Sequence, residues 1–162
     1  MPRVFTQTFG VVGAILEREG KFLLVRESNR KGPDDGKWNQ PAGWVDVGEN
    51  PLEAVRREVE EETGLALIPT HIVGIYSLVR KDIEKELGAT PHAIKIIFTG
   101  IVSDSETSAL ADDITETRWF SPEEIYAMNG EVLRDADIKQ EVKDYLAGKK
   151  YPLEMLHHTV SR

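Results

Sequence analysis

The sequence predicts an α/β (α+β) fold in which helices pack on the faces of a mixed β-sheet. Several short runs rich in Val, Ile and Leu are separated by turn residues, a pattern typical of strands. Two other segments carry apolar residues at helical spacing and begin with helix-start signals. Strands and helices mix without strict alternation along the chain, so a mixed sheet is the natural class.

The length and composition predict one globular domain spanning residues 1–162. Hydrophobic residues make up 40% and charged residues 30%, which excludes a disordered or membrane-embedded class. The absence of cysteine excludes disulfides, a thiol nucleophile and cysteine-based zinc sites, and it favours a reducing compartment. Residues 1–10 lack the apolar core of a signal peptide. We therefore expect a cytoplasmic monomer or homodimer that binds no membrane.

The formal net charge is -8 at pH 7. An acidic surface repels phosphate, so no duplex nucleic acid is expected as a partner. A small phosphate-bearing substrate is still compatible with this charge, because a divalent cation held by carboxylates reverses the local sign. Such a site requires acidic residues that are grouped around one ion.

The N-terminal half begins with two expected strands, Gly10 to Leu16 and Lys21 to Val25. The polar segment Glu17 to Gly20 between them predicts a turn. Ser28 to Gly36 is expected to be a loop because it is rich in Gly, Pro, Asp and Asn. A proline and a glycine interrupt Trp38 to Asp46, so this segment is expected to be extended but irregular.

The clearest helix is expected at Pro51 to Thr63. Asn50 is a good N-cap, proline suits the first helical position, and Glu53 follows the cap by three residues. Gly64 provides the stop signal. The apolar stripe of this helix consists of Leu52, Val55 and Val59.

The C-terminal half mixes strands with two further helices. The Arg80 to Thr90 stretch is polar and is expected to be a loop or lid. Ser121 is expected to cap a short helix, and Asp137 to Ala147 has the apolar stripe of a terminal helix. Strands are expected at Ala66 to Val79, Ala93 to Val102 and Glu116 to Phe120.

Three glutamates share one face of the helix at Pro51 to Thr63. Glu58, Glu61 and Glu62 lie at positions i, i+3 and i+4, where like charges repel by roughly 0.2–0.5 kcal/mol per pair. A bound cation removes this repulsion. Mg²⁺ prefers hard oxygen ligands of this kind, and Mn²⁺ also suits an all-oxygen site. The alternative is a solvated acidic face, which is the usual meaning of a charge run.

The longer segment from Gly43 to Leu65 distinguishes these alternatives. It resembles the Nudix box of MutT-like Nudix hydrolases. That motif is Gly, five residues, Glu, seven residues, Arg-Glu, an aliphatic residue, any residue, Glu-Glu, any residue, Gly, and an aliphatic residue. Every specified position is filled, by Gly43, Glu49, Arg57, Glu58, Val59, Glu61, Glu62, Gly64 and Leu65.

The resemblance implies a Nudix α/β/α sandwich with a mixed β-sheet, in which the box forms a loop-helix-loop. It also implies an enzyme that depends on Mg²⁺, with Mn²⁺ as a substitute. Glu58, Glu61 and Glu62 match the metal-binding glutamates, and Glu58 matches the general base of some members. Arg57 matches the arginine that orients these glutamates, so these four residues are the expected catalytic residues.

Other matched positions imply a supporting role. Gly43 allows the tight turn into the box, Glu49 supports the loop, and Gly64 ends the helix. The carbonyl of Ala42 matches a common metal ligand, although many members have Gly-Gly where this chain has Ala42-Gly43. A further acidic ligand often precedes the last strand of the fold, and Asp113 is the expected one.

A finer resemblance concerns substrate choice. WNQPAG (Trp38 to Gly43) and YPLEM (Tyr151 to Met155) look like a branch of phosphatases acting on nucleoside di- and triphosphates and on hydroxymethylpyrimidine pyrophosphate. Expected substrate contacts are Trp38, Gln40, Tyr76 and Arg80. A core role for the tryptophan and a surface role for the tyrosine and arginine are the alternatives.

The expected reaction is metal-dependent hydrolysis of a phosphoanhydride bond in a small nucleotide or pyrophosphate, by attack of water at phosphorus. One alternative is a pyrophosphohydrolase that acts on a nucleoside diphosphate linked to another group, such as ADP-ribose. Another is a Nudix-fold module that binds a nucleotide without cleaving it. Such modules usually lose box glutamates, and this chain keeps them all. The sequence contains no G-x-S-x-G elbow and no Walker-type loop.

Overall fold

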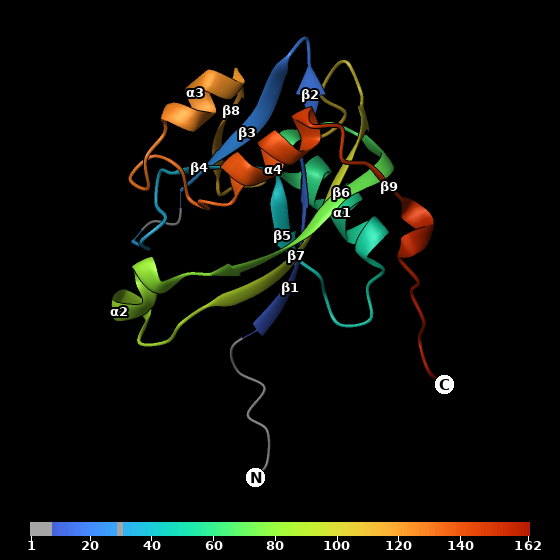
Figure 1. Cartoon of the computed structure of the whole chain (residues 1–162), viewed down its shortest axis with the longest axis horizontal. Helices are drawn as coiled ribbons and strands as arrows, with labels where there is room; N and C mark the ends of the chain where they lie inside the picture. Colours follow the sequence, from blue (N-terminus) through green and yellow to red (C-terminus); the bar gives the residue numbers. More distant parts are fainter. Residues whose placement is uncertain (1–7, 29–30) are drawn as a thin grey trace.

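The computed structural model describes residues 8–28 and 31–162, whose strands form two sheets between helices (Figure 1). The N-terminal half contains β1 (Thr8–Ala14), β2 (Glu17–Arg18), β3 (Lys21–Glu27), β4 (Trp38–Asn39), β5 (Ala42–Trp44) and α1 (Pro51–Thr63). The C-terminal half contains β6 (Leu67–Val79), η1 (Lys81–Ile83), α2 (Glu84–Leu87), β7 (His92–Val102), β8 (Ile114–Phe120), α3 (Pro122–Ala127), α4 (Ile138–Leu146), β9 (Tyr151–Pro152) and η2 (Leu153–Met155).

The larger sheet is mixed, as expected. Its strand order is β5-β1-β7-β6-β9, in which β1 and β7 run parallel and the other neighbours run antiparallel. The second sheet is built on β3, which pairs with β2, β4 and β8. The hairpin from β2 to β3 turns at Glu19 and Gly20, both with positive φ, which is the geometry of a tight two-residue turn.

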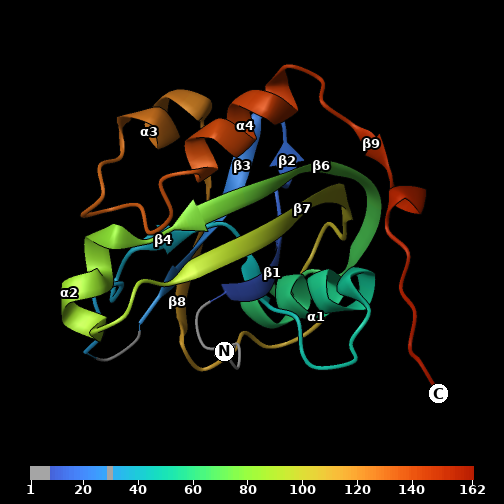
Figure 2. The same cartoon turned by 60° about the horizontal axis from the view of Figure 1, so that its bottom comes forward.

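The helices lie on opposite sides of the sheets, and this makes a layered sandwich (Figure 2). The helix α1 packs against β1, β5 and β6 of the larger sheet. Its buried Val55 and Val59 meet Val12 and Phe98 in one core cluster. On the other side, α3 and α4 bury Ile125, Ile138 and Val142 against Phe22 and Leu24 in a second cluster. The α/β/α architecture expected from the sequence is therefore confirmed.

The helix α1 forms where its sequence signals placed it. The side chain of Asn50 accepts a hydrogen bond from the Leu52 N–H, and Pro51 occupies the first turn. Gly64 ends the helix with φ of 71°, and its N–H donates to the Glu60 carbonyl. The cap of α3 is also as expected, because Ser121 and Glu124 form a reciprocal capping box.

The segment Arg80 to Thr90 was expected to be a loop or lid, and the prediction that it lacks helices is wrong. Two short helices, η1 and α2, occupy this segment at the tip of the hairpin formed by β6 and β7. The prediction failed because Ile83 is the single buried apolar residue in this polar run, which leaves no helical apolar pattern. The expected loop at Ser28 to Gly36 includes residues 29–30, and the expectation for residues 1–10 includes residues 1–7; both ranges lie outside the described residues. In the described ranges, no helix is long and apolar enough to cross a membrane.

Candidate active site

A pocket of about 590 Å³ lies beside α1, at the edge of the larger sheet formed by β5. It contains two of the box glutamates, Glu58 and Glu62, together with Ala42, Gly43 and Asp113 from the predicted set. The fold thus brings Asp113, from the loop before β8, to the same pocket as Ala42, which is 71 positions away in the chain.

Glu58 lies against the backbone of β5. A Cβ atom built on Gly43 would lie 2.1–2.3 Å from the three carboxylate atoms of Glu58, a separation that no real side chain tolerates. Glycine at this position therefore makes room for the carboxylate. The Glu58 side chain is only 13% exposed, and this burial raises its pKa above the ordinary value for glutamate.

Glu62 is more deeply buried and is held by the same strand. Its Oε2 accepts a hydrogen bond from the Ala42 N–H at 2.9 Å. Burial, followed by the nearby charge of Glu27, raises the pKa of Glu62 well above its ordinary value. Two carboxylates at the end of one pocket thus carry a desolvation cost that a cation would offset.

Arg57 connects the carboxylates around the box. Its guanidinium donates to Glu49 at 2.9 and 3.0 Å, to Glu58 at 2.7 Å and to Glu61 at 3.3 Å. A fifth bond reaches the Trp44 carbonyl at 3.2 Å. Glu49 also accepts from the Asp46 N–H, which closes the loop before α1, and the Arg57 hydrogen bond lowers the pKa of Glu49 to about 2. The arginine thus fixes the loop and Glu58 together.

The remaining predicted ligands lie farther out. Glu61 is half exposed and bonds to Arg57 rather than lining the pocket. Asp113 lines the pocket from the loop before β8, and its carbonyl accepts from the Ser28 N–H. Among residues 8–28 and 31–162, no three His, Cys, Asp or Glu side chains already converge as a metal cage. The donors fit a hard divalent ion in kind, because Glu58 and Glu62 supply buried carboxylate oxygens beside the Ala42 backbone.

Two of the predicted substrate contacts lie in the core instead of the pocket. Trp38 is 8% exposed and packs edge-on against Phe120, with ring centroids 4.8 Å apart. Gln40 is fully buried, and its amide nitrogen lies close to Gly13. The structure therefore places Trp38 in the alternative role, as a core tryptophan.

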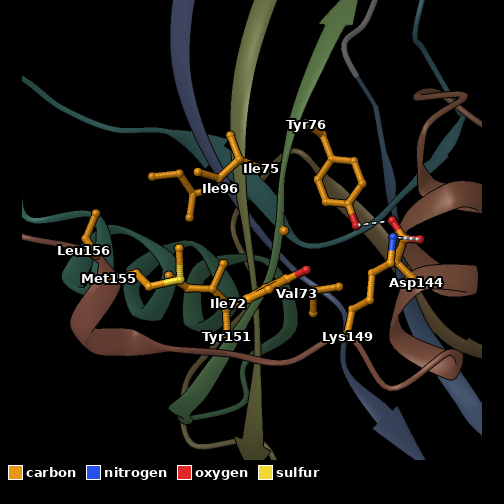
Figure 3. A pocket seen from close by; sticks show the side chains of 11 residues that line it. Ile72, Val73, Ile75, Tyr76, Ile96, Asp144, Lys149, Tyr151, Met155 and Leu156 are labelled. Carbon is orange, nitrogen blue, oxygen red and sulfur yellow. Dashed lines mark hydrogen bonds and ion pairs between the residues drawn. The ribbon is translucent and has the colours of Figure 1, made fainter.

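The side chains of Tyr76 and Arg80 also bond to other residues of the protein. The Tyr76 hydroxyl donates to Asp144 at 2.8 Å in a separate pocket beside β9 (Figure 3). Arg80 lines the pocket of the glutamates, but its guanidinium is 8% exposed and bonds to Asp34, Asp82 and Asp135. A free phosphate contact is thus not available from Arg80 in this arrangement.

The comparisons with known proteins agree with this geometry. A model of the NUDIX domain matches residues 6–142 of the 162 residues. The chain belongs to the Nudix family. It is a Nudix hydrolase that keeps every specified residue of the box.

Relatives cover nearly the whole Nudix chain. Phosphatase NudJ of Escherichia coli is 33% identical over 147 residues, which is 90% of this chain and 88% of that protein. A NUDIX hydrolase of Nitrosomonas europaea is 33% identical, with a TM-score of 0.77 over 94% of this chain and 98% of that one. A MutT protein of Methanosarcina mazei Go1 is 31% identical, with a TM-score of 0.70 over 91% of this chain and 100% of that one.

The Nudix pocket also contains charged residues that the sequence did not single out. Glu27 is 6% exposed, and its Oε2 accepts from Arg134 at 2.7 Å; burial raises its pKa. Lys95 is 1% exposed and pairs with Asp135. Glu27 and Arg134 are 107 positions apart in the chain, and Lys95 and Asp135 are 40 positions apart. No spacing pattern in the sequence indicates pairs at such separations. A charged residue at the end of the apolar run FLLVRE was the one available signal for Glu27.

Proposed function

We propose that this Nudix hydrolase cleaves a phosphoanhydride bond in nucleoside di- or triphosphates, or in related small pyrophosphates, with Mg²⁺ or Mn²⁺. The single observation that carries the proposal is the desolvated pair Glu58 and Glu62, held by β5 in one pocket. Arg57 pairs with Glu58, whereas the hydrogen bond to Glu62 comes from the uncharged Ala42 N–H. One guanidinium beside two buried carboxylates leaves a desolvation cost that a divalent ion would offset.

In this proposal, Glu58, Glu62 and the Ala42 carbonyl hold the ion, with Asp113 and Glu61 as further ligands. When bound, the ion neutralises phosphate oxygens and lowers the pKa of a coordinated water. A Glu58 carboxylate oxygen takes one proton from the attacking water. The new bond joins the water oxygen to phosphorus, and the anhydride P–O bond breaks, so its electron pair leaves with the departing phosphate group.

Arg57 acts as a positioning residue. Its bond to Glu58 at 2.7 Å holds this carboxylate beside β5, and its paired bonds to Glu49 anchor the guanidinium to the loop. Glu61 is 52% exposed and bonded to the same guanidinium, so it must turn away from Arg57 to reach an ion. This arrangement predicts that Glu61 contributes less to ion binding than Glu62.

The setting of the reaction follows from the composition. We propose that residues 1–162 act as one domain in a reducing, cytoplasmic environment, which is supported by the absence of cysteine.

Substrates are small, because the pocket holds about 590 Å³. The name of the 33% identical relative, Phosphatase NudJ, supports the release of phosphate from the substrate.

The test is a product analysis. Purified protein with Mg²⁺ is given nucleoside di- and triphosphates, hydroxymethylpyrimidine pyrophosphate and ADP-ribose, and released phosphate, pyrophosphate and monophosphate are scored. Phosphate or pyrophosphate from the first two groups supports the proposal. Cleavage confined to ADP-ribose, giving AMP and ribose 5-phosphate, would instead establish the pyrophosphohydrolase alternative.

Two variants then test the assigned carboxylates. Glu58→Gln should lower kcat roughly 10²–10⁴-fold, which is the usual contribution of a general acid or base. Glu62→Gln should also lower kcat, because it removes a charged ligand of the ion. The matched control is Glu60→Gln, because Glu60 is exposed on the same helix and fills a position of the box that any residue can occupy. Turnover that is equal in all three variants would refute the roles given to Glu58 and Glu62.

A further inference from the structure

An exposed aromatic pair lies at the same pocket. The rings of Phe9 and Trp44 stack with centroids 4.7 Å apart and planes inclined by 11°, and both residues line the pocket. Trp44 is 61% exposed although it is one of the largest apolar side chains in the chain. Phe9 covers one face of the indole, so a large apolar surface beside the carboxylates faces solvent.

Strand register places this pair on a continuous apolar floor. Phe9 lies opposite Ala93, which lies opposite Leu78, so the three residues form one row across β1, β7 and β6. Trp44 lies opposite Val11, two residues along β1 from Phe9. Directly paired residues share a face of a sheet, and so do alternate residues of a strand. All five side chains therefore belong to the face opposite α1.

The tip of the β6–β7 hairpin supplies the facing wall. Ile83 of η1 and Leu87 of α2 both line the pocket, and Leu87 is 52% exposed. Figure 2 shows α2 at the far end of this hairpin. We define the ring recess as Phe9, Trp44, Leu78, Ile83, Leu87 and Ala93.

The strand β5 connects the recess to the carboxylates. Gly43 faces Glu58, and the next residue, Trp44, projects to the opposite face of the strand. Consecutive Cα atoms are about 3.8 Å apart. The glutamates and the aromatic pair thus lie on opposite sides of one edge strand and line a single pocket, an arrangement that suits a ring joined to a phosphate chain through a short linker.

We propose that the ring recess binds a planar aromatic ring of the substrate and that Trp44 selects ring-bearing phosphate compounds over ring-free ones. The inference rests on the proposed function, because the phosphate chain is placed at Glu58 and Glu62. A flat ring on an exposed indole gains stacking and buries apolar area on both partners. The polar residues of the pocket do not compete for this role, since Arg80, Lys95 and Arg134 are each paired with carboxylates.

The test compares binding of ligands that differ only in the ring. Isothermal titration calorimetry in Mg²⁺ buffer measures Kd for AMP, CMP and ribose 5-phosphate with wild type, Trp44→Ala and Trp44→Phe. Ile75→Ala is the matched control, because Ile75 is a 66% exposed apolar residue of β6 that does not line this pocket. Thermal unfolding verifies that each variant is folded.

In wild type, at least one nucleotide should bind more than tenfold tighter than ribose 5-phosphate. Trp44→Ala should raise the nucleotide Kd roughly five- to hundredfold, in line with the loss of one base–aromatic stack. Trp44→Phe should retain most of the affinity, and Ile75→Ala should match wild type. Equal Kd values for the nucleotides and ribose 5-phosphate, or a wild-type nucleotide Kd in Trp44→Ala, would overturn the inference.

The product analysis separates this inference from the proposed function. Hydrolysis of pyrophosphates without any preference for ring-bearing ligands would refute the ring recess and leave the function intact. Ring-dependent binding without hydrolysis of any pyrophosphate would refute the proposed function and leave the recess intact.

Discussion

Replacing Gly43 with alanine tests the geometry of the carboxylate site directly. The added Cβ would meet the carboxylate carbon of Glu58 at 2.1 Å, so that carbon must move by about 1.3 Å to reach an ordinary contact of 3.4 Å. The φ angle of Gly43 is not positive, so the backbone itself accepts alanine. A misplacement of about 1 Å in a catalytic group costs roughly 10²-fold in rate, and we expect a loss of that order.

The assay is initial-rate product release with the best substrate of the panel, together with urea unfolding. The free energy of unfolding should fall by no more than about 1 kcal/mol, because the displaced group is the end of a flexible side chain. Gly130→Ala is the control, since a Cβ there meets nothing within 4 Å. In a Glu58→Gln background the alanine should cost little more. Full activity of Gly43→Ala, or an equal further loss in that background, would refute the reasoning.

Two further predictions concern the buried charges. Arg80→Ala should destabilise the protein by about 3 kcal/mol in urea unfolding, because it removes a buried cation from Asp34 and Asp135. Arg118→Ala is the control, because it removes an exposed ion pair with Glu124 at 3.7 Å, and it should lower the free energy of unfolding by under about 1 kcal/mol. Equal losses of stability in the two variants would contradict the argument that burial makes the Arg80 pairs stronger. Burial raises the pKa of Glu141 from 4.5 to about 8, so the folded state binds its proton more tightly and stability should fall as pH rises from about 4.5 to 8. Glu141→Gln should flatten this slope, and an unchanged slope would exclude Glu141 as its source.

Local signals made the carboxylate helix predictable in detail. Asn50, Pro51 and Gly64 act within one helical turn of their own positions, so their effects on α1 did not depend on the rest of the fold. The box positions then followed, because i, i+3 and i+4 spacing fixes a shared face. The structure adds that Glu58 and Glu62 line the pocket while Glu61 lies outside it, a distinction that depends on where β5 packs.

The other end of the pocket was not predictable from single segments. The stack of Phe9 on Trp44 depends on the register of β1 with β5. This register pairs Val11 with Trp44, which are 33 positions apart in the chain. Register comes from the packing of the whole sheet, and it is weakly specified in a short strand such as β5. The prediction of Trp38 as a substrate contact came from the WNQPAG resemblance and from the ability of tryptophan to stack on a base, and neither shows that its ring packs on Phe120 in the core.

A titration of Mn²⁺, followed by electron paramagnetic resonance of the free ion, tests the central claim most directly. We expect saturable binding to wild type and to Glu60→Gln, and binding at least about tenfold weaker in the Glu58→Gln, Glu62→Gln double variant, which removes both buried carboxylate charges. The same affinity in the double variant and in wild type would contradict the assignment of the ion to this helix.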